Sequence, residues 1–156
     1  MDNVADDLDL PVNEYLNKHT DLNLAVSLIG YFPATNETLI EGEIWLYRGR
    51  DSWNFGLDHI WAGRQLELKN RNVHTVRELI NFLILIISKN TPIYPEPKHT
   101  KAAVVKSSKG AVIIENISDD YSAVTLLIST VARPLPVEKR WGNRRLNTIK
   151  IDCKTI

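Results

Sequence analysis

Residues 76–88 constrain the fold most, because they combine a helix start signal with an apolar surface covering almost the whole circumference of a helix. Thr75 and Glu78 have the Thr-x-x-Glu spacing of a capping box, in which each side chain accepts a hydrogen bond from a first-turn amide. The sequence Asn-Thr-Pro at 90–92 then ends the helix. A helix that is apolar on most sides belongs in a core. We therefore expect one largely buried helix over 76–88.

Three β-type segments follow this helix. "KAAVVK" and "AVIIEN" are separated by "SSKG", a hairpin signal of small polar residues and a glycine between two β-branched runs. "SAVTLLISTVA", residues 122–132, is a third long strand. Upstream, residues 42–48 alternate and are rich in β-formers, which predicts another strand.

The remaining N-terminal sequence, "PVNEYLNKHTDLNLAVSLIGYF", is interpreted as one or two short helices, with Pro11 at a permissible first-turn position. The order of elements predicts an α+β fold. N-terminal helices and one buried helix would pack on one face of a mainly antiparallel, meander-type sheet and leave its other face free.

A length of 156 residues suits one domain. We expect an acidic flexible arm at 1–10 and a single α+β domain at 11–156, with a core at about 42–134 and a basic tail at 135–156. The longest apolar run is too short to span a membrane, and the N-terminus lacks a signal-peptide pattern, so we expect a cytoplasmic protein without a membrane partner. Cys153 is the one cysteine, which excludes an internal disulfide. No motif indicates a metal or a cofactor, and we expect neither.

The charge is distributed unevenly although the formal net charge is zero. Residues 1–40 contain seven acids and one lysine, whereas residues 41–156 contain twelve acids and eighteen lysines and arginines. An acidic arm on a basic body suggests a body that meets a polyanion. Solvated surface of both signs explains the counts equally well.

The stretch "NFGLDHIWAGRQLEL", residues 54–68, contains the main candidate for chemistry. Gly56 permits a turn conformation that larger residues avoid, and His59 then opens a short helix. Imidazole titrates near neutrality, so it can take and return a proton at working pH. The alternative is an ordinary histidine at a helix start.

The predicted sheet offers further candidates. Alternation places Val124, Leu126, Ile128 and Thr130 on one face of the last strand, and Thr125, Leu127, Ser129 and Val131 on the other. Either Ser129 or Thr130 therefore points away from the helix-packed face. Lys101 and Lys106 bracket an earlier strand and supply cations to that open face. Solvated strand ends and a satisfied hydroxyl are the plain alternative.

The basic tail holds one tryptophan among cations. Lys139, Arg140, Trp141, Arg144 and Arg145 form a segment suited to contacting phosphates and stacking on a base. A charged surface segment anchored by its tryptophan accounts for the same residues.

The patterns "FGLDHI", "VRELINFLILIISKNTPIY", "TKAAVVKSSKGAVIIE" and "VTLLISTVA" occur in an order that resembles the barnase/EndoU/colicin/RelE-like ribonuclease superfamily, in particular the C-terminal RNase domains of phage-associated and polymorphic bacterial toxins. The resemblance runs from about residue 42 to 134. It implies a metal-independent endoribonuclease, in which the ribose 2′-hydroxyl attacks its own phosphate and leaves a 2′,3′-cyclic phosphate. It also implies RNA, such as tRNA, as the substrate, a cognate immunity protein, and delivery to a target-cell cytoplasm.

The resemblance implies roles for individual residues. His59 would be the general base or acid, Lys101 a cation that stabilises the phosphate, and Thr130 or Ser129 a hydrogen-bond donor to it. Arg64 stands where relatives often carry a second histidine. Arginine suits phosphate binding but does not exchange protons, since its pKa lies above about 12. The acid would then be His99, Lys101 or water, or the site would be degenerate.

Two other functions fit the sequence. One is a non-catalytic binding module, such as an immunity protein, inhibitor or mobile-element accessory protein, with an acidic or aromatic surface as its interface. The other is a small-molecule site in a cavity lined by Trp45, Trp53 and Trp61, with His59 or Arg64 as the polar anchor.

Overall fold

The computed structural model describes residues 6–32, 41–87, 91, 93–95, 102–117 and 120–128. Its elements, in chain order, are η1 (Asp6–Asp9), α1 (Val12–Lys18), β1 (Ala25–Phe32), β2 (Gly42–Tyr47), η2 (Asp51–Trp53), α2 (Gly56–Asn70), α3 (Val76–Ile86), β3 (Ile93–Pro95), β4 (Ala102–Ser107), β5 (Gly110–Ile117) and β6 (Asp120–Ile128). The α+β class is confirmed.

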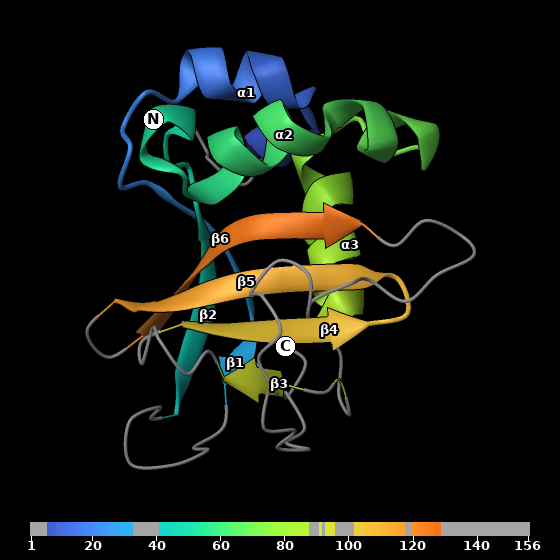
Figure 1. Ribbon diagram of the computed structural model, residues 1–156. Coiled ribbons are helices and arrows are strands. Elements are labelled where there is room, and N and C mark those ends of the chain that lie inside the picture. The colour runs from blue at the N-terminus through green and yellow to red at the C-terminus, as the bar shows by residue number, and fades with distance from the viewer. Residues whose placement is uncertain are drawn as a thin grey trace.

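One six-stranded sheet has the order β1-β2-β6-β5-β4-β3. β4, β5 and β6 form the predicted antiparallel meander, and β3 and β1 extend it at opposite edges. The exception to antiparallel pairing is β2 with β6, which run parallel. Figure 1 shows α3 behind the sheet and α2 above it next to β6, with α1 above α2.

The helix that dominated the sequence pattern begins as predicted. Glu78 donates its backbone N–H to the Thr75 hydroxyl at 3.2 Å, and the Glu78 carboxylate accepts the Thr75 backbone N–H at 3.1 Å. Leu79, Leu83 and Ile86 of α3 are fully buried. They share one core cluster with side chains from the sheet, among them Ile44, Leu46, Val105, Val112, Ile114 and Leu126. Burying each such leucine contributes roughly 2 kcal/mol, so this layer is the main source of stability.

The second face of the sheet is not free along β4 and β5. Val104, Ala111 and Ile113 alternate with the core-facing residues of these strands, and the strand register places Val104 opposite Ile113. All three are at most 7% exposed although they lie outside the α3 core. The expectation of an open face therefore fails over this part of the sheet.

The N-terminal helical prediction is half wrong. α1 occupies 12–18, but residues 25–32, which we expected to be helical, form strand β1 paired with β2. The register of β1 is irregular between Ala25 and Ser27 and again between Leu28 and Gly30. These irregularities break the alternation of the strand, so its buried side chains fall at a helix-like spacing and mislead a pattern-based prediction.

The described residues of the expected arm, 6–10, are packed on the domain. Among residues 6–10, Leu8 and Leu10 pack against the core cluster. Asp7 forms ion pairs with Lys18 at 3.1 Å and with His19 at 2.7 Å. The Lys18 and His19 hydrogen bonds hold the pKa of Asp7 below its usual value. The tail expected at 135–156 lies outside the described residues.

Candidate functional site

Two glycines in close contact shape the loop that leads into α2. Gly49 and Gly56 have φ values of +67° and +85°, which favour glycine. A Cβ atom on Gly56 would lie 2.7 Å from the Gly49 Cα, so the backbones pack without room for a side chain. The conformational role predicted for Gly56 is confirmed. Arg50 and Phe55 bridge this loop, and Asn54 has a left-handed conformation between them.

β2 and β6 separate soon after they meet. They pair at Ile44–Tyr121 and Trp45–Ser122, and beyond that point α2 lies alongside β6. Arg64 on α2 donates its Nε–H to the main-chain carbonyl of Leu126 at 3.0 Å and contacts Glu67 at 3.2 Å. The side chain proposed to bind phosphate thus closes the edge of β6 that β2 leaves unpaired.

A β-bulge in β6 changes which side chains face the site. Ile113 pairs with Thr125 and Ile114 with Ala123, so Val124 is an extra residue in the ladder. Leu126 belongs to the α3 core, whereas Val124 lines a pocket on the other face. The prediction that these two side chains share a face is wrong, because alternation assumes an unbroken ladder.

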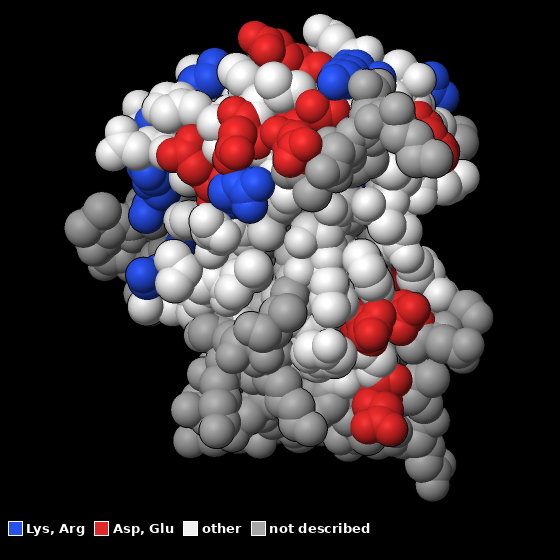
Figure 2. Space-filling model, turned by 180° about the vertical axis from the view of Figure 1, so that it is seen from behind, with Lys and Arg blue, Asp and Glu red and all other residues white. Residues whose placement is uncertain are grey.

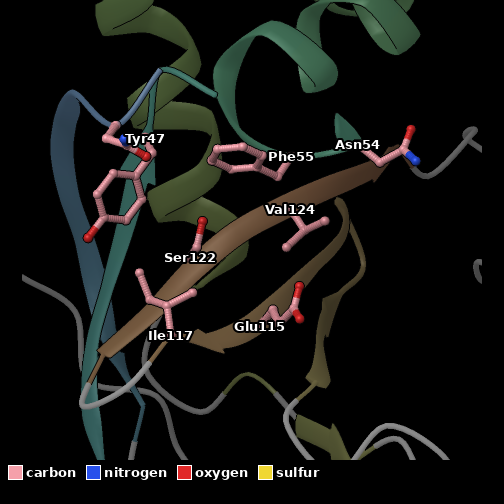
Figure 3. Close-up of a pocket in the computed structure, with 8 residues that line it drawn as sticks. Tyr47, Asn54, Phe55, Glu115, Ile117, Ser122 and Val124 are labelled. Carbon is pink, nitrogen blue, oxygen red and sulfur yellow. The ribbon is translucent and has the colours of Figure 1, made fainter. Parts of the chain in front are cut away.

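This pocket has a volume of about 440 Å³ and opens to solvent. Its lining residues come from the turn before β1, from β2 and β6 where these strands separate, from the loop before α2, and from β5: Asn23, Tyr47, Asn54, Phe55, Glu115, Ile117, Ser122 and Val124. Figure 3 shows the rings of Tyr47 and Phe55 on either side of Ser122, with Glu115 and Ile117 below them. The result is a hollow with mainly apolar walls and a few polar groups.

Two polar groups on the pocket floor come from paired positions of β5 and β6. Ser122 lies opposite Glu115 in the strand register. Ser122 is 3% exposed, and its hydroxyl donates to the Ala123 carbonyl at 3.5 Å, the outer limit of a hydrogen bond. The Glu115 carboxylate is exposed and has no ion pair among the described residues. Both groups therefore retain acceptor capacity for a ligand.

Tyr47, which forms one wall of the pocket, has a hydroxyl whose pKa is affected by nearby carboxylates. Burial raises the pKa of the Tyr47 hydroxyl, and the charges of Asp120 and Glu43 raise it further. These carboxylates are held in place, since Asp120 accepts the Glu43 backbone N–H at 3.2 Å and Glu43 accepts the Trp45 indole N–H at 2.9 Å. These two carboxylates place negative charge near the Tyr47 hydroxyl.

His59 lies beside the pocket and does not line it. It is in the first turn of α2, and its Nδ1 is 3.0 Å from Asp51 Oδ1. Asp58 accepts the Asp51 backbone N–H at 3.2 Å and lies 3.7 Å from Arg48. The imidazole, 22% exposed, is thus oriented by one carboxylate, with a second close by in the same turn.

The predicted site residues are not gathered around His59 as far as the structure describes them. Arg64 is held by Leu126 and Glu67, and Lys106 is on β4, two strands from β6. The other candidates, Lys101, Ser129, Thr130, Arg140, Trp141, Arg144 and Arg145, lie outside the described residues, as does His99.

The tryptophans do not form the predicted cavity wall. The Trp45 indole donates to Glu43, and the Trp61 indole donates to Asn13 at 3.1 Å. Neither lines the pocket, whose aromatic walls are Tyr47 and Phe55. The Trp53 side chain is outside the described part.

Acidic side chains gather over the helical end of the molecule on the side opposite to that of Figure 1, with lysine and arginine between them (Figure 2). Within the described part of the chain, no group of three or more His, Cys, Asp or Glu side chains is placed to hold a metal ion. None of the described helices combines the length and apolar character needed to cross a membrane.

Sequence reasoning missed most of the pocket. Asn23, Glu115, Ile117 and Ser122 carry no local motif, and residues 23 and 122 are far apart in the chain. Tyr47 and Phe55 fall within segments that the sequence singled out, but for other reasons. No protein-family model matches the chain, and no match was found among curated proteins or solved structures.

Proposed function

We propose that the protein is a non-catalytic binding module whose recognition site is the pocket between Tyr47, Phe55 and the β5–β6 floor. The observation that carries this proposal is an open hollow of about 440 Å³ with aromatic and apolar walls and a few convergent polar groups. Ligand sites in proteins typically occupy about 300–1,000 Å³ and have this mixed lining.

The pocket is built on well-held elements, which favours recognition. The Arg50–Phe55 bridge and the glycine contact fix the loop that carries Phe55. The floor consists of paired strand residues, Glu115 and Ser122. A preformed site loses little conformational entropy on binding, so its contacts translate more fully into affinity.

A fragment series tests the proposal. Backbone amide NMR shifts would be followed while benzamidine, benzyl alcohol and benzoate, three rings of similar size, are added separately at millimolar concentration. We expect at least one fragment to shift the amides of Tyr47, Phe55 and Val124 in a saturable manner. The Val124→Trp variant, which fills the pocket, should lose this response.

The matched control is Leu66→Trp, which introduces the same side chain at a position that is 75% exposed on α2 and outside the pocket. This variant should bind as the wild type does. If none of the three fragments shifts pocket amides, or if both variants lose binding equally, the pocket is not the recognition site.

A metal-independent endoribonuclease is the second candidate, and the His59–Asp51 pair favours it. A carboxylate 3.0 Å from Nδ1 orients the imidazole and leaves Nε2 to exchange a proton with a substrate hydroxyl. The resemblance noted above would make this proton transfer the activation of a ribose 2′-hydroxyl. We rank it second because the group that contacts the ring is the Asp51 carboxylate, with the Asp58 carboxylate hydrogen-bonded to the Asp51 backbone, and both would repel a phosphate.

Incubation with total tRNA in EDTA separates the two candidates. A ribonuclease would produce 2′,3′-cyclic phosphate ends with the wild type and none with His59→Ala. Under the binding-module proposal, the RNA stays intact with both proteins while the fragment response persists.

A further inference from the structure

Among the described residues that line the pocket, Glu115 is the charged one. It is exposed on the β5 part of the pocket floor, and no ion pair neutralises it among the residues described. An entering carboxylate or phosphate would meet this negative charge directly, whereas a cation would be attracted. Glu115 therefore favours cationic over anionic ligands.

Two more carboxylates, near Tyr47, act in the same direction. Asp120 and Glu43 lie close enough to raise the pKa of Tyr47, after the larger effect of burial. Each already accepts a hydrogen bond from a protein N–H, so neither can turn away without breaking that bond. Together with Glu115 they place negative charge on the pocket floor and near Tyr47.

The aromatic walls suit a cation as well. Tyr47 and Phe55 present rings from two different elements on either side of Ser122 (Figure 3). The face of an aromatic ring attracts a cation placed within about 6 Å of its centre. The nearly buried Ser122 hydroxyl adds an acceptor on the floor, and Val124 and Ile117 supply contacts for an apolar stem.

We infer that the ligand of this pocket carries a cationic end (a guanidinium, amidinium or ammonium) on a short apolar stem. This inference rests on the proposed binding function and names its ligand class.

The fragment series already described distinguishes failure of the inference from failure of the function. We expect benzamidine to bind about fivefold more tightly than benzyl alcohol, and benzoate to bind most weakly, in line with the strength of partly exposed charge pairs. Added salt should weaken benzamidine binding and leave benzyl alcohol unchanged. If benzoate and benzyl alcohol bind as well as benzamidine, the pocket binds ligands but the inferred charge preference is wrong. If nothing binds, the proposed function itself fails.

Glu115→Gln removes the charge while keeping the size and shape of the side chain. It should weaken benzamidine binding about threefold and leave benzyl alcohol binding unchanged. Glu14→Gln is the control, since Glu14 is an exposed α1 residue that does not line the pocket. Equal effects of the two variants would assign the preference to the net charge of the protein and overturn the role of Glu115.

A comparison of two ligands then shows whether the cation belongs to a free small molecule or to a partner protein. Agmatine represents a free small molecule, and a capped Gly-Arg-Gly peptide represents an arginine side chain of a partner protein. The matching citrulline peptide is the neutral control. Tighter binding of the arginine peptide than of agmatine points to a protein partner, and the reverse points to a free amine or guanidine. Binding of the citrulline peptide as tight as that of the arginine peptide would contradict the inference.

Discussion

Arg64 on α2 donates its Nε–H to the main-chain carbonyl of Leu126 on β6 at 3.0 Å. This contact joins a helix to a strand edge that β2 does not cover, since β2 and β6 pair at two positions and then separate. A side chain suited to phosphate recognition is used here for a structural purpose. The same divergence of strands creates the space in which the pocket forms.

Replacing Arg64 should therefore reduce stability. Arg64→Ala leaves the Leu126 carbonyl without its donor, and losing a hydrogen bond from a charged group costs about 1–3 kcal/mol. Urea unfolding measures this cost as a lower midpoint with an unchanged slope. Lys109→Ala, at an exposed position in the β4–β5 turn, is the comparison and should change stability less. An unchanged midpoint in Arg64→Ala would mean that the contact contributes nothing net.

A pair of glycine substitutions tests the glycine contact before α2. Gly56→Ala should destabilise by more than about 1 kcal/mol, because its φ of +85° is strained for alanine and its Cβ would meet Gly49 at 2.7 Å. Gly63→Ala, within α2, meets nothing within 4 Å and should stabilise by about 0.5–1 kcal/mol. Thermal or urea unfolding compares the two. Equal destabilisation by both would refute the contact.

The two faces of α3 differ in what a leucine contributes. Leu83 is fully buried, whereas Leu85, two residues later, is 51% exposed. Leu83→Ala should cost about 2–5 kcal/mol through lost burial and a cavity. Leu85→Ala should change stability by less than about 0.5 kcal/mol. If the order were reversed in urea unfolding, the helix would present its other face to the sheet.

The capping box gives stability a pH dependence. Hydrogen bonds from the backbone amides of Thr75 and His74 lower the pKa of Glu78 below its usual 4.5. A lowered folded-state pKa means that the stabilisation is fully present above about pH 4.5 and is lost as pH falls through the lowered value. Glu78→Gln removes this ionisation. We expect its deficit in the free energy of unfolding, measured by urea at several pH values, to be constant near neutrality and to shrink on acidification.

A deficit that instead grew at acidic pH would contradict the lowered pKa. Thr75→Ala is the control, because it removes the cap hydroxyl without removing the carboxylate. It should cost about 1 kcal/mol near neutral pH.

Several features of this protein follow from local sequence. The Thr-x-x-Glu signal specifies the start of α3, and the apolar content of the residues behind it specifies a place in the core. The β4–β5 hairpin and β6 follow from short β-branched runs around a glycine turn. The turn conformation of Gly56 follows from the glycine itself. These elements depend on residues a few positions apart, so a single sequence contains their cause.

Tertiary structure decided the rest. Residues 25–32 became an irregular strand because β2 offered a pairing partner, and the bulge at Val124 depends on β5 opposite it. The pocket exists because the divergence of β2 from β6 brings Tyr47 and Phe55 over Glu115 and Ser122. His59, singled out from its local context, instead lies beside the pocket with Asp51. Pairing register, bulges and pockets arise from contacts between distant segments, and local periodicity carries no information about which segments will meet.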